Sequence, residues 1–183
     1  MLTLVIIAIL AYSFYTGYRR GLVMQAIRFV GYAISLMIAG QFAPQLAKLA
    51  EFFVPFPSIQ QQTQLSVYNE VASFILDSAF YRAISFVAIA FVGWVITNLV
   101  SVAFRKVRFY EVFRLANHMG GGILNALISF VIVFYLLFIL SLIPIDRVQQ
   151  QFVDNPIAYR IVTGTPVLSD MASKSWLDGN VYR

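Results

Sequence analysis

The side chains that most often perform chemistry are scarce in this sequence. Cysteine is absent, so the chain forms no disulfide, thiolate nucleophile or cysteine metal site. The single histidine, His118, has no second histidine with which to share a metal. No serine–histidine–aspartate set, phosphate-binding glycine loop or zinc-protease helix motif is present. We therefore expect no enzyme activity, no catalytic residue, no metal and no cofactor, and we interpret His118 as an interfacial polar residue.

Three polar residues, Arg28, Asn98 and Asn125, stand inside long apolar stretches. Polar groups are costly in hydrocarbon and often mark function there. At about 1.5 Å per residue, all three fall roughly 5 to 12 Å below the same side of a bilayer. They form a candidate polar layer, which Gln25 and Thr97 extend. The alternative is that Arg28 reaches the head groups while the asparagines make interhelical hydrogen bonds, each worth about 0.6 kcal/mol.

Glycine supplies a second pattern, at the start of the last apolar stretch. Gly120, Gly121 and Gly122 open this stretch, and Gly121, Asn125 and Ser129 follow one another at intervals of four. One helical face therefore stays small or polar, which lets another backbone approach closely. We predict a helix-packing site at Gly120, Gly121, Gly122 and Ser129. A hinge at the three glycines is the alternative.

The elements that must carry these residues are membrane-spanning helices. Of the 183 residues, 60% are apolar and 11% are charged, whereas a soluble domain carries about a quarter charged residues. A span needs about 20 mostly apolar residues. Four blocks qualify, at about 2–18, 22–42, 81–104 and 121–143. The sequence predicts an all-α fold, a polytopic membrane helical bundle with about four transmembrane helices in a single domain, 1–183.

The positions of arginine and lysine predict an orientation. Arg19 and Arg20 follow the first block, and four cations follow the third: Arg105, Lys106, Arg108 and Arg114. Both connections are then cytoplasmic, both termini lie outside the cytoplasm, and the cations face anionic lipid head groups. Because nothing basic precedes the first block, we expect a retained helix and not a cleaved signal peptide. Nucleic acid binding is not expected from so few dispersed charges.

Two segments are predicted outside the membrane. Apolar residues recur at three- and four-residue intervals over about 64–79, which predicts an external amphipathic helix in the outer interface. This helix either caps the bundle or docks a partner. In the external tail, 144–183, Thr165-Pro166 is typical of a helix start, and the helix would continue towards Trp176. Trp176 and Tyr182 are of the type found at membrane interfaces.

Two stretches resemble motifs of a known family. Thr16–Val23, which contains Arg19, Arg20 and Gly21, follows the short first block, and Asn117–Gly122 leads into the fourth. They are similar to the two signature regions of the CvpA, or colicin V production protein, family. The resemblance covers nearly the whole chain, including the number of helices, the long external connection and the short tail.

The sequence departs from the family pattern at its acidic positions. Family members commonly carry an acidic residue near the start of the first helix, where this chain has Thr3 or Leu4. They often have an Asp-Arg-like pair and repeated glycines near the fourth helix, where this chain has Asn117, His118, Asn125 and Ser129. Roles that depend on those acidic groups do not carry over to this chain.

The resemblance implies a protein of the bacterial cytoplasmic membrane. Members of the family are similar to the inner-membrane protein needed for production or export of the toxin colicin V. The resemblance also implies a broader role in maintaining the cell envelope. Two functional classes stay open. An accessory or scaffold would dock other envelope proteins through its external segments or its glycine-lined helix face. A homo-oligomeric channel or transporter would pass its substrate through the Arg28, Asn98 and Asn125 layer. The scaffold is preferred because four spans give one subunit little room for an aqueous path.

Overall fold

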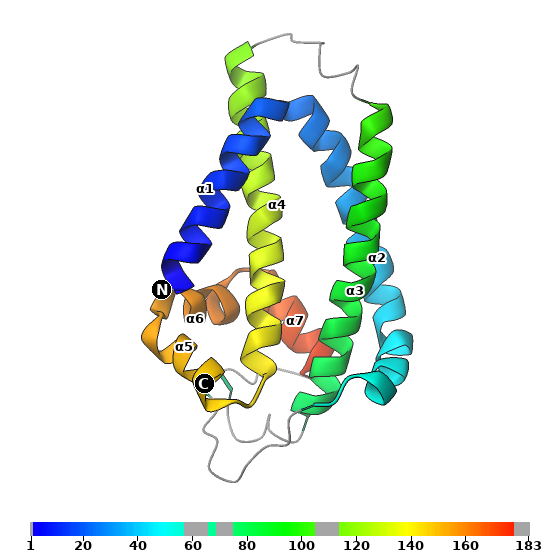
Figure 1. Ribbon diagram of the computed structural model, residues 1–183, viewed down its shortest axis with the longest axis vertical. Helices are drawn as coiled ribbons and strands as arrows, with labels where there is room; N and C mark the ends of the chain where they lie inside the picture. The colour runs from blue at the N-terminus through cyan, green and yellow to red at the C-terminus, as the bar shows by residue number, and fades with distance from the viewer. Residues whose placement is uncertain (1, 57–65, 69–74, 105–113, 178–183) are drawn as a thin grey trace. The chain divides into compact units, whose positions relative to one another are not determined.

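The described residues of the protein are helical throughout most of their length. The structure, a computed structural model, describes residues 2–56, 66–68, 75–104 and 114–177. These described residues form seven helices (Figure 1): α1 (Leu2–Arg20), α2 (Leu22–Phe53), α3 (Leu76–Ala103), α4 (Arg114–Leu142), α5 (Asp146–Asp154), α6 (Pro156–Gly164) and α7 (Leu168–Trp176). The predicted all-α fold is confirmed.

Helices α1 to α4 have the length and composition of membrane spans. They contain 19, 32, 28 and 29 residues, and only 17 to 22% of the most apolar window of each is buried inside the protein. Even the shortest rises about 28 Å, close to the thickness of the hydrocarbon layer. Because most of their apolar surface faces outward, these four helices fit a multi-pass membrane protein.

The long helices extend beyond the predicted spans. Helix α2 runs past residue 42 to Phe53 and contains Pro44, helix α3 begins at Leu76, and helix α4 begins at Arg114. The three glycines therefore lie inside α4 and do not open it. Hydropathy marks the part of a helix that fits hydrocarbon, whereas hydrogen bonding and capping set its ends. Pro44 has no N–H to donate to the carbonyl of Gly40, which leaves one gap in the α2 ladder.

In the described part of 64–79, the structure departs from the predicted amphipathic helix. Ser66–Tyr68 lies outside any helix, residues 76–79 form the first turn of α3, and the remaining positions fall outside the described ranges. Tyr68 is 1% exposed, and its hydroxyl lies 2.6 Å from the Ser141 hydroxyl. At Ser66–Tyr68, long-range hydrogen bonds to α4 and α5 therefore accompany a non-helical conformation that the periodicity of the apolar residues did not predict.

The chain folds as two compact units. Unit 1 comprises Met1–Thr3, Ala43–Ser85 and Phe134–Arg183, and unit 2 comprises Leu4–Phe42 and Phe86–Val133. Helices α2, α3 and α4 each contribute to both, and Pro44 in α2 lies next to the boundary.

Unit 1 is held together by a buried glutamine. Gln149 of α5 donates from its amide nitrogen to the carbonyls of Ser141 (3.0 Å) and Ile143 (2.9 Å). Its amide oxygen accepts from the Ser66 backbone N–H at 2.9 Å. Gln149 is 2% exposed, so its carboxamide satisfies backbone groups where α4 ends that have no helical partner.

An aromatic cluster in unit 1 corrects the expectation for Trp176. The Trp176 ring centroid lies 5.2 Å from that of Phe138 and 5.8 Å from that of Tyr135, both on α4. Trp176 is 7% exposed, so it is a core residue of this unit and not an exposed interfacial anchor. Tyr182 lies outside the described residues.

The last helix begins two residues later than the predicted Thr165-Pro166 start. Thr165 ends α6 instead, with its hydroxyl donating to the Ile161 carbonyl at 2.6 Å. Leu168 N–H donates to the Pro166 carbonyl at 2.8 Å, and Val167 has φ 70 and ψ −53. This is a γ-turn with positive φ, a strained conformation for a β-branched residue. Helix α7 then runs from Leu168 to Trp176, as far as expected.

Candidate functional site in unit 2

Helices α1 and α4 meet through glycine. A Cβ atom on Gly17 would collide with the Gly121 carbonyl and with Asn125, and one on Gly121 would lie 2.5 Å from the Gly21 carbonyl carbon and 2.7 Å from the Gly17 oxygen. No side chain fits at these distances. The structure thus places Gly121 at a backbone-to-backbone contact, in the way that small residues pack spanning helices.

Asn125 ties the same two helices together. Its amide nitrogen donates to the Ser13 carbonyl at 2.6 Å and to the Thr16 hydroxyl at 3.1 Å. Four residues separate Asn125 from Gly121, so both lie on the face of α4 that covers α1. We call this contact the α1–α4 seam, formed by Ser13, Thr16, Gly17, Gly121 and Asn125.

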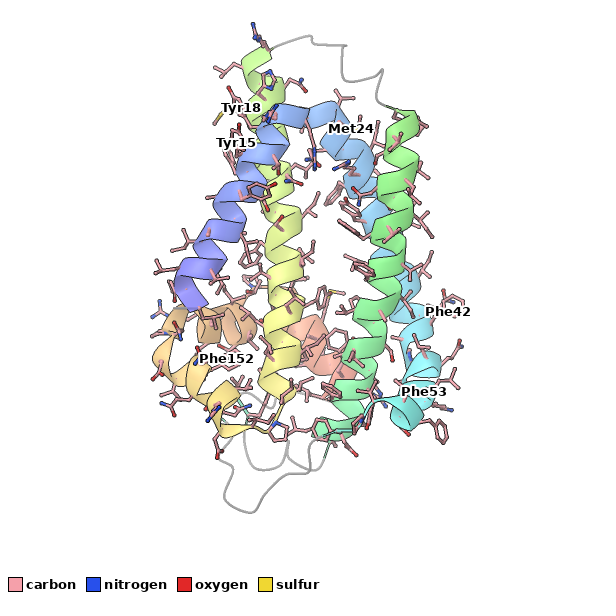
Figure 2. All side chains as sticks on the ribbon, in the orientation of Figure 1. Tyr15, Tyr18, Met24, Phe42, Phe53 and Phe152 are labelled. Atoms are coloured by element: carbon pink, nitrogen blue, oxygen red, sulfur yellow. The ribbon has the colours of Figure 1, made fainter. Side chains whose placement is uncertain are left out.

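A sharp corner joins α1 to α2 at Gly21, between the labelled residues Tyr18 and Met24 (Figure 2). Gly21 has φ 83, which a residue with a side chain rarely adopts, and its N–H donates to the Gly17 carbonyl at 3.0 Å. The next N–H, of Leu22, donates to the Asn117 side-chain oxygen at 2.8 Å. The corner is therefore fixed from α4.

His118 completes this contact. Its Nδ1 lies 2.6 Å from the Tyr18 carbonyl, so Nδ1 carries the hydrogen and donates it. The His118 ring stacks on the Tyr18 ring with centroids 5.0 Å apart. The stretches Thr16–Val23 and Asn117–Gly122, nearly a hundred residues apart, thus lie against each other, and His118 has a structural place at the corner.

Helices α2 and α3 form a second seam, which the sequence analysis did not identify. A Cβ on Gly31 would lie 2.5 Å from a methyl group of Thr97, and a Cβ on Gly93 would collide with Ser35. The Ser35 hydroxyl donates to the Gly31 carbonyl at 2.8 Å. Both helices carry small residues four apart, Gly31 with Ser35 and Gly93 with Thr97, a pattern that would have predicted this contact.

Asn98 lies beside this second seam. Its amide nitrogen donates to the Tyr32 hydroxyl of α2 at 3.2 Å and to the Trp94 carbonyl at 2.7 Å. Among the described residues, no hydrogen bond joins Arg28, Asn98 and Asn125. The candidate polar layer thus divides: Asn125 pairs with α1, Asn98 pairs with α2, and Arg28 bonds to neither asparagine.

Gln25 and Arg28 differ from the two asparagines, because each has buried side-chain atoms without a hydrogen-bond partner. Gln25 is 0% exposed, and neither atom of its carboxamide has a hydrogen-bond partner. The Nε of half-buried Arg28 is also buried without a partner. Thr97, the other predicted extension of the layer, is buried, and its carbonyl accepts from the Ser101 hydroxyl at 2.6 Å.

The remaining predicted residues lie around the two seams. Gly122 faces the Phe14 ring, Gly120 faces Leu22, and Ser129 is half-buried further along α4. Arg19 places its guanidinium 5.8 Å from the centre of the Tyr15 ring, and Arg114 is exposed at the start of α4. Arg105, Lys106 and Arg108 lie outside the described residues.

Comparison with known proteins gives two matches. A family model described as colicin V production protein matches residues 2–166, which include both stretches that meet at the Gly21 corner. The chain is also similar to the uncharacterized transmembrane protein YshB of Bacillus subtilis (strain 168). The two are 27% identical over 177 residues, which is 96% of this chain and 97% of that protein. No solved structure matches the chain.

Proposed function

Because the chain belongs to the colicin V production protein family, we propose that it is an accessory or scaffold protein of the bacterial cytoplasmic membrane. It serves envelope maintenance, or the production and export of a peptide toxin, by holding other envelope proteins. In this proposal both termini lie outside the cytoplasm, the basic connections face anionic head groups, and the protein itself catalyses no reaction.

The pairing of the two asparagines carries this proposal. A transport path needs polar groups that face water or a substrate. Asn125 instead donates to α1, and Asn98 donates to α2. Two of the three residues proposed to line a channel therefore hold helices together. This supports a packed scaffold over a pore within one subunit.

The apolar surface of α1 to α4 that is not buried inside the protein also supports the scaffold proposal. In each of α1 to α4, at least 78% of the most apolar window is not buried inside the protein. Lipid covers such a surface by default, and neighbouring membrane proteins pack on it through van der Waals contact and small residues. The two seams keep the helices that display this surface in fixed pairs.

Native mass spectrometry of the protein, extracted gently from its own membrane, tests the proposal. We expect a monomer or dimer that retains particular envelope proteins. An unrelated multi-pass protein with the same tag, extracted in parallel, should not retain them. A closed homo-oligomer without other proteins would refute the scaffold and favour the channel.

A deletion strain tests the cellular role. We expect it to become more sensitive to membrane-active compounds and to be complemented by the parent protein. Gly121→Leu, which disrupts the α1–α4 seam, should not complement, whereas Gly40→Ala should, because no atom lies within 4 Å of a Cβ at Gly40. Unchanged sensitivity of the deletion strain would remove the envelope role.

A further inference from the structure

Gln25 is the most unusual polar residue of unit 2. A carboxamide has two hydrogens to donate and an oxygen that accepts. Leaving such a group buried and unpaired costs free energy that folded proteins generally avoid. Yet Gln25 is fully buried, and neither its nitrogen nor its oxygen has a partner. A bound group with both acceptor and donor atoms would supply the hydrogen-bond partners that the Gln25 carboxamide lacks.

Arg28 lies three residues further along α2, on the same side of the helix. Its Nε is buried and unpaired, so at least one N–H of the guanidinium is directed away from solvent and lacks an acceptor. A guanidinium within a spanning helix requires a counter-charge or hydrogen-bond acceptors near it. Gln25 and Arg28 thus present unpaired donors from one helix face.

The described residues of unit 2 provide no counter-charge. They include Arg19, Arg20, Arg28 and Arg114 but no aspartate or glutamate. Arg20, at the end of α1, is close enough to Arg28 to repel it. Glu111 is the one acidic residue in the sequence of this unit, and it lies outside the described ranges. Among the described residues of unit 2, no carboxylate therefore balances the positive charge of Arg28.

We propose that Gln25 and Arg28, with Arg20 nearby, form a binding site for a phosphate group that still carries a proton, as in inorganic phosphate or a phosphomonoester. The ionised oxygens accept from the Arg28 Nε–H and from the Gln25 amide hydrogens. The P–OH hydrogen is donated to the Gln25 amide oxygen. Sulfate and phosphodiesters have no such hydrogen, so they leave the Gln25 oxygen unpaired.

The same chemistry has two sources, free phosphate in the cytoplasm and the head group of phosphatidic acid. Arg28 lies seven residues past Gly21, roughly 10 Å along the helix, so either source lies within a short distance of the site. The proposal is independent of the scaffold function, because it rests on the unpaired buried atoms of Gln25 and Arg28 and not on any partner protein.

Binding is measured on the whole protein in phosphatidylcholine nanodiscs and phosphate-free buffer. We expect labelled inorganic phosphate to bind saturably and to raise the melting temperature, with sulfate binding at least about fivefold more weakly because it has no hydrogen to donate. Gln25→Leu and Arg28→Gln should each weaken phosphate binding by about tenfold or more. Arg114→Gln, at an exposed arginine, should bind phosphate as the parent does.

Arg28→Lys guards against loss of folding, because it keeps the charge but removes the Nε donor. We expect this variant to melt near the parent in phosphate-free buffer and yet to bind phosphate less tightly. Nanodiscs that contain phosphatidic acid separate the two sources. If the lipid is the ligand, native mass spectrometry retains it on the parent but not on Arg28→Gln, and nanodiscs that contain it bind less labelled phosphate. If free phosphate is the ligand, phosphatidic acid changes nothing.

Three results would overturn the proposal. The first is that neither phosphate nor phosphatidic acid binds the parent. The second is that Arg114→Gln weakens binding as much as Arg28→Gln, which would indicate general charge attraction. The third is that Glu111→Gln destabilises the protein as much as Arg28→Gln while no phosphate binds, because the counter-charge would then come from the chain itself.

Discussion

Gly121 has no side chain to place, and for that reason α4 can lie against the corner at Gly21. The sequence predicted a small face on α4 from the spacing of Gly121, Asn125 and Ser129. It did not indicate which helix would cover that face, because periodicity describes one helix at a time, whereas the partner is selected in three dimensions. The role of Gly17 follows only from its contact with Gly121.

Gly121→Ala should destabilise the protein by about 1–3 kcal/mol, because the added methyl group overlaps backbone atoms that cannot rotate away. Thermal unfolding in detergent measures this loss. Gly40→Ala is the matched control in the same unit: it meets no atom within 4 Å and should be neutral or up to about 1 kcal/mol more stable. Equal melting temperatures for the two variants would contradict the close approach at Gly121.

Asn125→Leu should lower the free energy of unfolding by about 1–2 kcal/mol, because two interhelical hydrogen bonds disappear. Asn98→Leu should cost less, since its interhelical bond to Tyr32 is one contact of 3.2 Å. Unfolding in mixed detergent with increasing SDS compares the two. If Asn125→Leu is as stable as the parent, Asn125 does not stabilise the helix pair, and the hypothesis of a polar layer is favoured instead.

At the scale of the helix, hydropathy located all four spans but not their ends. Helix α4 already includes Arg114, well before the predicted span, because a helix continues wherever its backbone can form hydrogen bonds, including through residues that are not apolar. The segment around Ser66 and Tyr68 shows the opposite case. Its periodicity favoured a helix, yet a buried hydroxyl pair and a backbone bond to Gln149 determine its conformation. Such long-range bonds are not visible in local spacing.

Gln149→Leu should loosen the tail of unit 1. The change removes three hydrogen bonds made by one side chain. The bond to the Ser141 carbonyl is fully buried, and leaving that carbonyl unpaired costs about 1–3 kcal/mol. We expect faster cleavage of residues 144–177 in limited proteolysis and a lower melting temperature. Gln150→Leu, next to it but exposed and bonded only to Asp154, should behave as the parent does. Similar cleavage rates for both variants would show that the network contributes little.

At the scale of the whole molecule, composition alone was sufficient for the fold class. A chain with 60% apolar and 11% charged residues cannot cover a soluble surface, and the four long helices agree with that inference. The pairing of α1 with α4 and of α2 with α3 was not predicted, because several pairings satisfy the same hydropathy. The direction of insertion proposed above rests on the loop charges and not on the helices.

The orientation is tested by single cysteines placed at Gln61 and at Arg108, since the parent has none. In intact cells an impermeant maleimide should label the cysteine at 61 and should label the one at 108 only after permeabilisation. The reverse pattern would invert the protein in the membrane. It would also place the Gln25 and Arg28 pair near the outer face.

The Gly21 corner limits how the chain can change in length during evolution. Helix α2 begins directly after the corner, and a residue inserted into it before Gly31 would turn everything after it by about 100° around the helix axis. Gly31 and Ser35 would then no longer face α3, although the contact between α1 and α4 could remain. Substitution at Gly21 is limited by its positive φ, whereas insertion into α2 is limited by the direction in which the following residues then face. A homologue with an extra residue between the corner and Gly31 would therefore have to pair its helices differently.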